Sequence, residues 1–374
     1  MELRPLDLAG IFDRAATLYS RAFPSFVAIA TTAIVPVAVV QYFITIKEEP
    51  QLEATIRWLQ QPPAVQAQHL PSIFTSPEIV LFSAISLVLG YALTALAVGA
   101  VGAGVARWYR GEPVAYAPCY RMVLDRWAAV LSVVALALAV AVSVNAVALA
   151  AVLLPLAALG AAAPALIVGA VPLGLLALLL AICVVLTMLL VIGSCAIYAA
   201  VLERCSPSAA MRLTLRRICN RREIGRAFLC ASAVSIVGLV ATGVADVIAF
   251  ALLQRQPALY LALDTLARAL VVPLVAIVFA VYYFDVRIRQ EGFDLETRID
   301  SLRVGEPGQV ETAYASTRYL SGEQRELAAA FLSRRDALDE GRRREIAAHL
   351  VATFREHLPA ALQRLDDEAL LERL

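Results

Sequence analysis

The sequence predicts an all-α fold: a polytopic membrane bundle of six transmembrane helices in three hairpins, with interfacial amphipathic helices and a small cytoplasmic helical tail. Three observations favour this fold class. Hydrophobic residues make up 60% of the chain and charged residues only 17%, whereas soluble domains have about 45–50% and about 25%. Several apolar runs reach the roughly 20 residues that cross a hydrocarbon core. The arginines are gathered in alternate connections between those runs.

The segment from Glu203 to Arg226 orients the predicted bundle. It is a basic, helix-forming stretch between two apolar runs. Short arginine-rich loops stay on the cytoplasmic face, because moving them across the membrane during insertion is disfavoured. The topology anchors expected in this segment are Arg212, Arg216, Arg217, Arg221 and Arg222.

The apolar runs give the order of the predicted spans, which are about 25–46, 79–107, 127–154, 166–202, 227–253 and 266–284. A break at 155–164 separates the third span from the fourth. The fourth run is so long that it must tilt, break near Pro172 and Gly174, or project beyond the bilayer. An alternative division gives three spans between 127 and 202, but it would place basic loops on opposite faces, which the charge rule opposes.

A threefold pattern accompanies the spans. Arg-Pro at 4–5, Glu-Pro at 112–113 and Ser-Pro at 206–207 each open a short basic segment that leads into a pair of spans. In the third segment Ser206 is the expected N-cap and Pro207 the first helical residue. The alternative is a chance placement of helix-starting prolines, since the units share no residue-by-residue identity.

Three glycines near the end of the second span are candidate helix-packing residues. Gly99, Gly102 and Gly104 alternate with small residues and give a face on which another helix can pack closely. A phosphate-binding glycine loop would need a strand before these residues and a Lys-Ser/Thr pair after them, and the sequence has neither.

Asp246 is the one carboxylate that we expect inside the fifth span, where an unpaired charge is costly. Counting outward from Pro257 in an antiparallel pair of spans brings Asp246 level with Arg268. The two residues are therefore the candidate intramembrane ion pair. The alternative is that Asp246 faces a watery cavity and carries protons or substrate.

The sequence contains no motif of a known enzyme chemistry, such as H-E-x-x-H, G-x-S-x-G or a phosphate loop. We therefore expect no enzymatic activity, no catalytic residues, no cofactor and no metal site. The six cysteines lack C-x-x-C spacing and predict neither a disulfide framework nor a zinc site. The chain divides into a transmembrane domain at 1–297 and a linker with a helical tail at 298–374, whose second helix has an apolar stripe of Ile346, Leu350, Phe354 and Leu358.

Four stretches of the first domain carry a family resemblance: RPLDLAGIFDRAATLYSRAF, RWYRGEP, ERCSPSAAMRLTLRR and YYFDVRIRQEGFDLE. Together they resemble a bacterial six-helix membrane family, similar to the membrane domain of glycerophosphodiester phosphodiesterases. No stretch of this sequence resembles the catalytic domain of those enzymes, so we expect no such activity. The tail stretch LSGEQRELAAAFLSRRDALDEGRRREIAAHLVATFREHL resembles a segment of RDD-family and stage II sporulation protein M-like membrane proteins. These resemblances imply a multi-pass protein of the bacterial inner membrane and carry over no catalytic residue.

These features predict a non-catalytic scaffold or partner-docking component of the cell envelope. Its expected partners are the lipid bilayer and a protein bound at the cytoplasmic tail, with no nucleic acid. The alternative function is a transporter or lipid-handling protein that uses a polar site between the helices, because intramembrane polar residues and prolines mark such sites.

The predicted threading has six spans and both termini in the cytoplasm. Single cysteines introduced at Gln66 and Ser208 and labelled with a membrane-impermeant thiol reagent in intact cells are expected to lie on opposite faces, with only position 66 reacting. Labelling of both positions from outside would contradict the threading.

Overall fold

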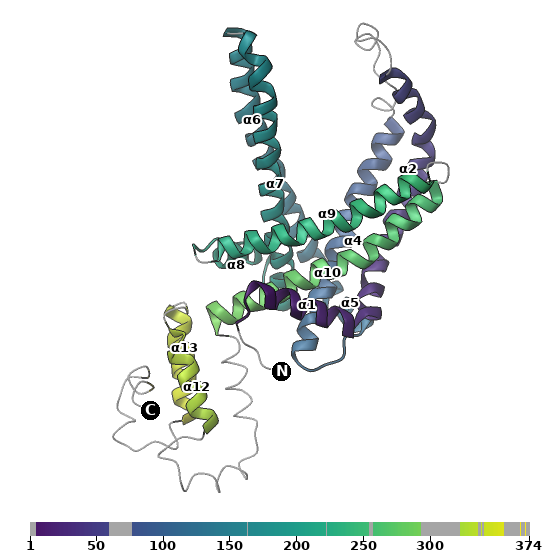
Figure 1. The fold of residues 1–374 in the computed structure, drawn as a ribbon. Helices are drawn as coiled ribbons and strands as arrows, with labels where there is room; N and C mark the ends of the chain where they lie inside the picture. The colour runs from purple at the N-terminus through teal and green to yellow at the C-terminus, as the bar shows by residue number, and fades with distance from the viewer. Residues whose placement is uncertain are drawn as a thin grey trace. The chain divides into compact units, whose positions relative to one another are not determined.

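Every regular element of the described chain is an α-helix. The computed structural model describes residues 5–59, 77–162, 164–221, 223–253, 257–292, 322–335, 338, 340–354, 367 and 371. Eleven helices and no strand occur in these residues (Figure 1). The predicted all-α fold class is confirmed. Helices suit a lipid environment because each one satisfies most of its backbone hydrogen bonds internally.

Six of these helices are long and apolar enough to cross a membrane, judged by length and composition. They are α2 (Phe23–Leu59), α4 (Pro77–Tyr109), α6 (Trp127–Ala162), α7 (Pro164–Leu202), α9 (Ile224–Leu253) and α10 (Pro257–Glu291). Large apolar side chains stand exposed along them, including Val88, Val142 and Leu239. Such a surface is unfavourable in water, and a lipid bilayer would cover it.

The apolar stretch at 127–202 forms two long helices. The break expected at 155–164 is shorter in the structure, since α6 passes through Pro155 and ends at Ala162, and α7 begins at Pro164. The two helices pack along each other as a hairpin (Figure 1). They have 36 and 39 residues. At 1.5 Å per residue they extend about 54 and 58 Å, well beyond the roughly 30 Å hydrocarbon core.

Among the described helices from α1 to α10, the order of one short helix followed by two long helices occurs three times. The short helices are α1 (Leu8–Arg21), α5 (Tyr116–Leu124) and α8 (Pro207–Ile218). At the start of α8 the Ser206 hydroxyl accepts a hydrogen bond from the Ala209 amide at 3.4 Å, and Pro207 lies in the first turn. Both are the starting signals that the sequence predicted.

The second long helix of each repeat is followed by a residue in the left-handed backbone region. The φ angles are 75° at Gly111 after α4, 54° at Arg204 after α7 and 61° at Gly292 after α10. This conformation turns the chain away from the helix end. Glycine adopts it freely, whereas Arg204 carries a cost of about 1–2 kcal/mol. The guanidinium of Arg126 donates a hydrogen bond to the Arg204 carbonyl and helps to hold this turn.

Each short helix packs against a long helix of the repeat before it, and α1 packs against the last repeat. In α5 the Tyr120 hydroxyl donates to the Ile29 carbonyl of α2 at 2.8 Å. Burial raises the pKa of Tyr120 to about 12, so the phenol remains a donor. Helix α8 packs against α6 and α7. In α1 the Tyr19 hydroxyl donates to the Leu270 carbonyl of α10 at 2.8 Å. These contacts connect the first repeat to the second, the second to the third, and α1 to the third.

In each repeat the second of the two long helices is α4, α7 or α10, and these three helices meet at Tyr198. This residue of α7 is completely buried, and its hydroxyl donates to the Ala276 carbonyl of α10 at 2.7 Å. Its ring lies on Gly102 of α4, where a Cβ atom would come within 2.3 Å of the ring atom Cδ1. A single side chain therefore contacts a helix from each repeat.

The chain divides into two compact units, one of residues 8–281 and one that combines 1–7 with 282–374. In the second unit the Leu6 amide donates to Asp285 Oδ1 at 2.7 Å, and Arg289 Nε donates to Asp285 Oδ2 at 2.9 Å. These bonds join the start of the chain to the end of α10. The boundary expected at residue 297 lies outside the described residues and stays a prediction.

The tail helices α12 (Gly322–Leu332) and α13 (Glu340–Phe354) build a hydrophobic core of their own. Its buried members are Leu327, Ala328, Phe331, Leu338, Ile346, Ala347, Leu350, Val351, Phe354 and Leu371. Three of the four predicted stripe residues thus face this core. The fourth, Leu358, lies outside the described residues.

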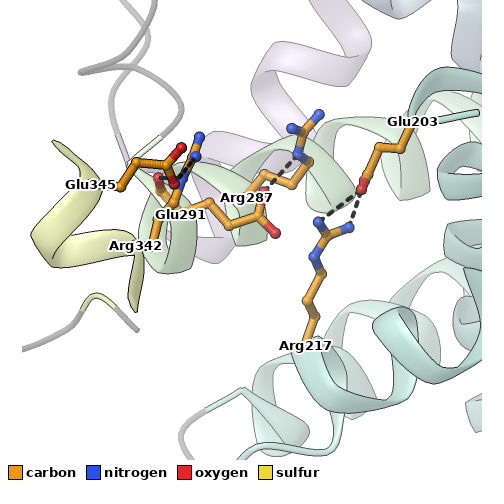
Figure 2. Close-up of polar contacts among 6 residues, drawn as sticks. All are labelled: Glu203, Arg217, Arg287, Glu291, Arg342 and Glu345. Carbon is orange, nitrogen blue, oxygen red and sulfur yellow. Dashed lines mark hydrogen bonds and ion pairs between the residues drawn. The ribbon is translucent and has the colours of Figure 1, made fainter. Parts of the chain in front are cut away.

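Arg342 connects the start of α13 to the end of α10 (Figure 2). Its Nε donates to the Glu291 carbonyl at 3.2 Å, and its Nη1 pairs with Glu345 Oε2 at 2.7 Å. The Glu291 side chain accepts a hydrogen bond from Arg287 Nε at 3.0 Å. The second unit is therefore held by polar contacts as well as by its small core.

The substitution Gly102→Ala is expected to lower the melting temperature of the detergent-purified protein. The added methyl group must displace the buried Tyr198 ring, and such overpacking costs about 1–3 kcal/mol. Gly238→Ala is the matched control, because a Cβ there meets nothing within 4 Å. Equal melting temperatures for the two variants would contradict the close contact at Gly102.

Candidate functional site

A cavity of about 430 Å³ lies between α2, α4 and α10. Its polar lining residues are Gln41, Thr94, Asp264, Thr265 and Arg268, and its apolar ones are Ile34, Val37, Ala38, Leu261 and Val272. The volume falls within the range of ligand pockets, about 300–1,000 Å³, and such pockets combine apolar walls with a few convergent polar groups. The cavity is therefore our candidate functional site.

An ion pair within α10 supplies the charge of the cavity. Asp264 and Arg268 are four residues apart, so the helix places both side chains on one face. Arg268 Nε donates to Asp264 Oδ1 at 2.8 Å. The Asp264 side chain is only 11% exposed, whereas the Arg268 side chain is 56% exposed. A carboxylate buried to this degree is costly without a cation beside it, and Arg268 provides that cation.

The cavity lies toward one end of the apolar segments. No charged residue occurs in α10 between Arg268 and Asp285, so Arg268 marks one edge of the apolar part of that helix. On α2, Gln41 lies close to the end of the candidate span Phe23–Ile44. Arginine side chains near the end of a span extend toward the headgroup region. The polar lining would thus lie near one surface of the bilayer.

The wall between α2 and α4 is closely packed beside the cavity. The Ser86 hydroxyl of α4 donates to Gln41 Oε1 at 3.5 Å. One turn further along α4, a Cβ at Gly90 would lie 3.7 Å from Val37 Cγ1. These contacts place α4 against the face of α2 that carries Val37 and Gln41.

The predicted partner of Arg268 was Asp246, and the structure gives Arg268 a different carboxylate. Asp246 belongs to α9, but its side chain lies outside the described residues, so the pair with Arg268 stays a prediction. Sequence reasoning missed Asp264 because it began the sixth span at about Leu266, whereas α10 begins at Pro257. The spacing of four between Asp264 and Arg268 was the signal that could have found the pair.

The three candidate packing glycines contact three different helices. Gly99 faces Val123 of α5, where a Cβ would lie 3.2 Å from Cγ2. Gly102 holds the Tyr198 ring of α7. A Cβ at Gly104 would meet Phe26 Cε1 of α2 at 3.0 Å. This end of α4 is therefore surrounded by neighbouring helices instead of packing on one partner.

The arginine-rich segment separates into exposed and buried side chains. Arg212, Arg216 and Arg221 are exposed, and Arg222 lies outside the described residues. Arg217 is 7% exposed, and its Nη1 and Nη2 bind the two carboxylate oxygens of Glu203 at 2.6 and 3.1 Å (Figure 2). A bidentate pair of this kind has a structural role, since it connects α8 to the residue that follows α7.

No group of three or more His, Cys, Asp or Glu side chains is placed to hold a metal ion in the part of the chain that the structure describes. The six cysteines are free thiols. Burial raises the pKa of the Cys119 thiol in α5, which keeps it protonated and unreactive.

The six long apolar helices and their exposed apolar surface define a multi-pass integral membrane protein. No protein-family model, no curated protein and no solved structure matches the chain. The family resemblance noted from the loop motifs accordingly stays an expectation.

The pair in α10 gives a test that separates the two carboxylates. Arg268→Gln is expected to destabilise the purified protein by about 1–3 kcal/mol, because it leaves the Asp264 carboxylate, which is only 11% exposed, without its cation. Asp264→Asn is expected to cost less, because the guanidinium that loses its partner is exposed. Asp264→Arg combined with Arg268→Asp should recover part of that loss in thermal unfolding. If recovery occurs only for Asp246→Arg combined with Arg268→Asp, the pair joins α9 to α10 instead.

Proposed function

We propose that this membrane protein handles a lipid or another amphiphile, whose polar end binds in the cavity between α2, α4 and α10. The observation that carries the proposal is the ion pair between the largely buried Asp264 carboxylate and Arg268 in the lining of that cavity. Ionisable residues in membrane helices are expensive, and those that face an internal cavity commonly mark a binding site or a transport route.

The arrangement of the lining supports an amphiphile. Along α10 the charged pair precedes Val272, and along α2 the apolar Ile34 and Val37 precede the polar Gln41. If α2 and α10 run in opposite directions through the membrane, the polar groups lie toward one surface and the apolar groups lie deeper. A molecule with a polar end and an apolar chain would match this gradient.

Filling the cavity is expected to displace the bound molecule. Ala38→Trp places a large side chain at the cavity wall, whereas Ala135→Trp changes an exposed position of α6 and serves as the matched control. Both proteins would be purified in mild detergent, and copurified lipids would be counted per protein by mass spectrometry. We expect Ala38→Trp to lose one or more bound lipids that the control retains. Equal lipid content would contradict the proposal.

A second candidate is the scaffold role expected from the sequence. It is favoured by the separate hydrophobic core of α12 and α13, which would let the tail fold as a module that presents its charged outer face to a partner. We also infer from the arginine distribution that the protein lies in the inner membrane with both termini in the cytoplasm.

The scaffold role predicts that deletion of residues 306–374 leaves membrane insertion intact. The melting temperature of the bundle should change little, because the tail core is internal to the tail and the Arg342 contact that is lost reaches only the last residue of α10. Fractionation and thermal unfolding of the truncated protein check this expectation. Loss of the inserted, folded bundle would show that the tail is a structural part of it.

A further inference from the structure

Both side chains of the ion pair in the cavity have hydrogen-bonding groups that could bind a ligand. The hydrogen bond between the two side chains uses only Nε of Arg268 and Oδ1 of Asp264. A guanidinium has five N–H donors, and a carboxylate can accept several hydrogen bonds. Among the described residues, no other hydrogen bond of either group is recorded. The pair thus presents a cationic and an anionic end side by side.

We infer that the cavity binds a phosphate group joined to a primary ammonium group, which is the headgroup chemistry of an ethanolamine phospholipid. This inference rests on the proposed function and specifies its ligand. Arg268 would bind the phosphate oxygens and Asp264 would accept from the ammonium group. A ligand with both charges can pair its anionic group with Arg268 and its cationic group with Asp264. A purely anionic ligand would be repelled by the Asp264 carboxylate, and a purely cationic ligand would be repelled by Arg268.

The remaining polar groups favour a primary over a quaternary ammonium. Quaternary ammonium groups cannot donate hydrogen bonds, and proteins recognise them with aromatic side chains. No aromatic residue lines the cavity among the residues that the structure describes. Gln41, Thr94 and Thr265 instead bring oxygen acceptors to the wall. These acceptors suit a group with three N–H donors.

The same headgroup chemistry exists in a lipid and in a soluble glycerophosphoethanolamine. The apolar walls formed by Ile34, Val37 and Val272 favour the lipid, because they can cover the first part of an acyl chain. The test therefore has separate arms for the two sources.

The first arm measures headgroup preference. The full-length protein, delipidated in detergent, receives equal amounts of phosphatidylethanolamine, phosphatidylcholine and phosphatidylglycerol with identical acyl chains, and native mass spectrometry counts each bound lipid. We expect the ethanolamine lipid to be preferred about tenfold, the effect of one charged hydrogen bond. Asp264→Asn should remove this preference while phosphate binding persists, and Arg268→Gln should weaken binding of all three lipids. Ala135→Trp is again the control.

The second arm uses the wild-type protein alone, so it holds even if a variant fails to fold. Soluble glycerophosphoethanolamine and glycerophosphocholine compete against the bound ethanolamine lipid. Displacement by the first and not by the second supports the headgroup assignment and identifies a soluble source. Displacement by neither, together with the tenfold lipid preference, supports the lipid as the source.

Equal binding of the three lipids would overturn the headgroup assignment. If Ala38→Trp still removes bound lipid in that case, the cavity handles lipids without selecting this headgroup, and the proposed function stands. If Ala38→Trp also has no effect, both the headgroup assignment and the proposed function fail.

Discussion

The contact of Tyr198 with Gly102 and Ala276 is the constraint on which the arrangement of the first unit depends. The phenol ring needs a neighbour without a side chain, and its buried hydroxyl needs an acceptor. Gly102 of α4 meets the first need and the Ala276 carbonyl of α10 meets the second. Because the three helices belong to three different repeats, this single residue sets how closely the repeats approach.

The position of the cavity follows from this packing. Gly99 to Val105 of α4 and Ala276 to Val281 of α10 are buried without interruption. The cavity residues Thr94 and Asp264 precede those segments by one or more helical turns. The cavity thus lies beyond the tightly packed core, where α2 and α4 still contact each other and residues of α10 complete the lining. Short helices α1, α5 and α8 join neighbouring repeats, so the opening between α2, α4 and α10 can persist while the bundle stays connected.

The sequence predicted the elements of this protein better than their contacts. Hydrophobicity and length located the six long helices, and the N-cap at Ser206 was readable because capping depends on local residues. The break expected at 155–164 was too long, because Pro155 lies inside α6 and does not end that helix. The burial of Arg217 depends on its pairing with Glu203, which counting charges does not reveal. The cavity at Asp264 depends on the start of α10 at Pro257, which the predicted span missed.

The length of the α6–α7 hairpin makes this protein sensitive to the thickness of the membrane around it. Both helices are apolar almost throughout and exceed the hydrocarbon core by many residues. A bilayer responds to such mismatch through helix tilt or through local thickening, each at a modest free-energy cost per ångström. Lipids with longer acyl chains would reduce that cost. The protein is therefore expected to concentrate where the membrane is thickest.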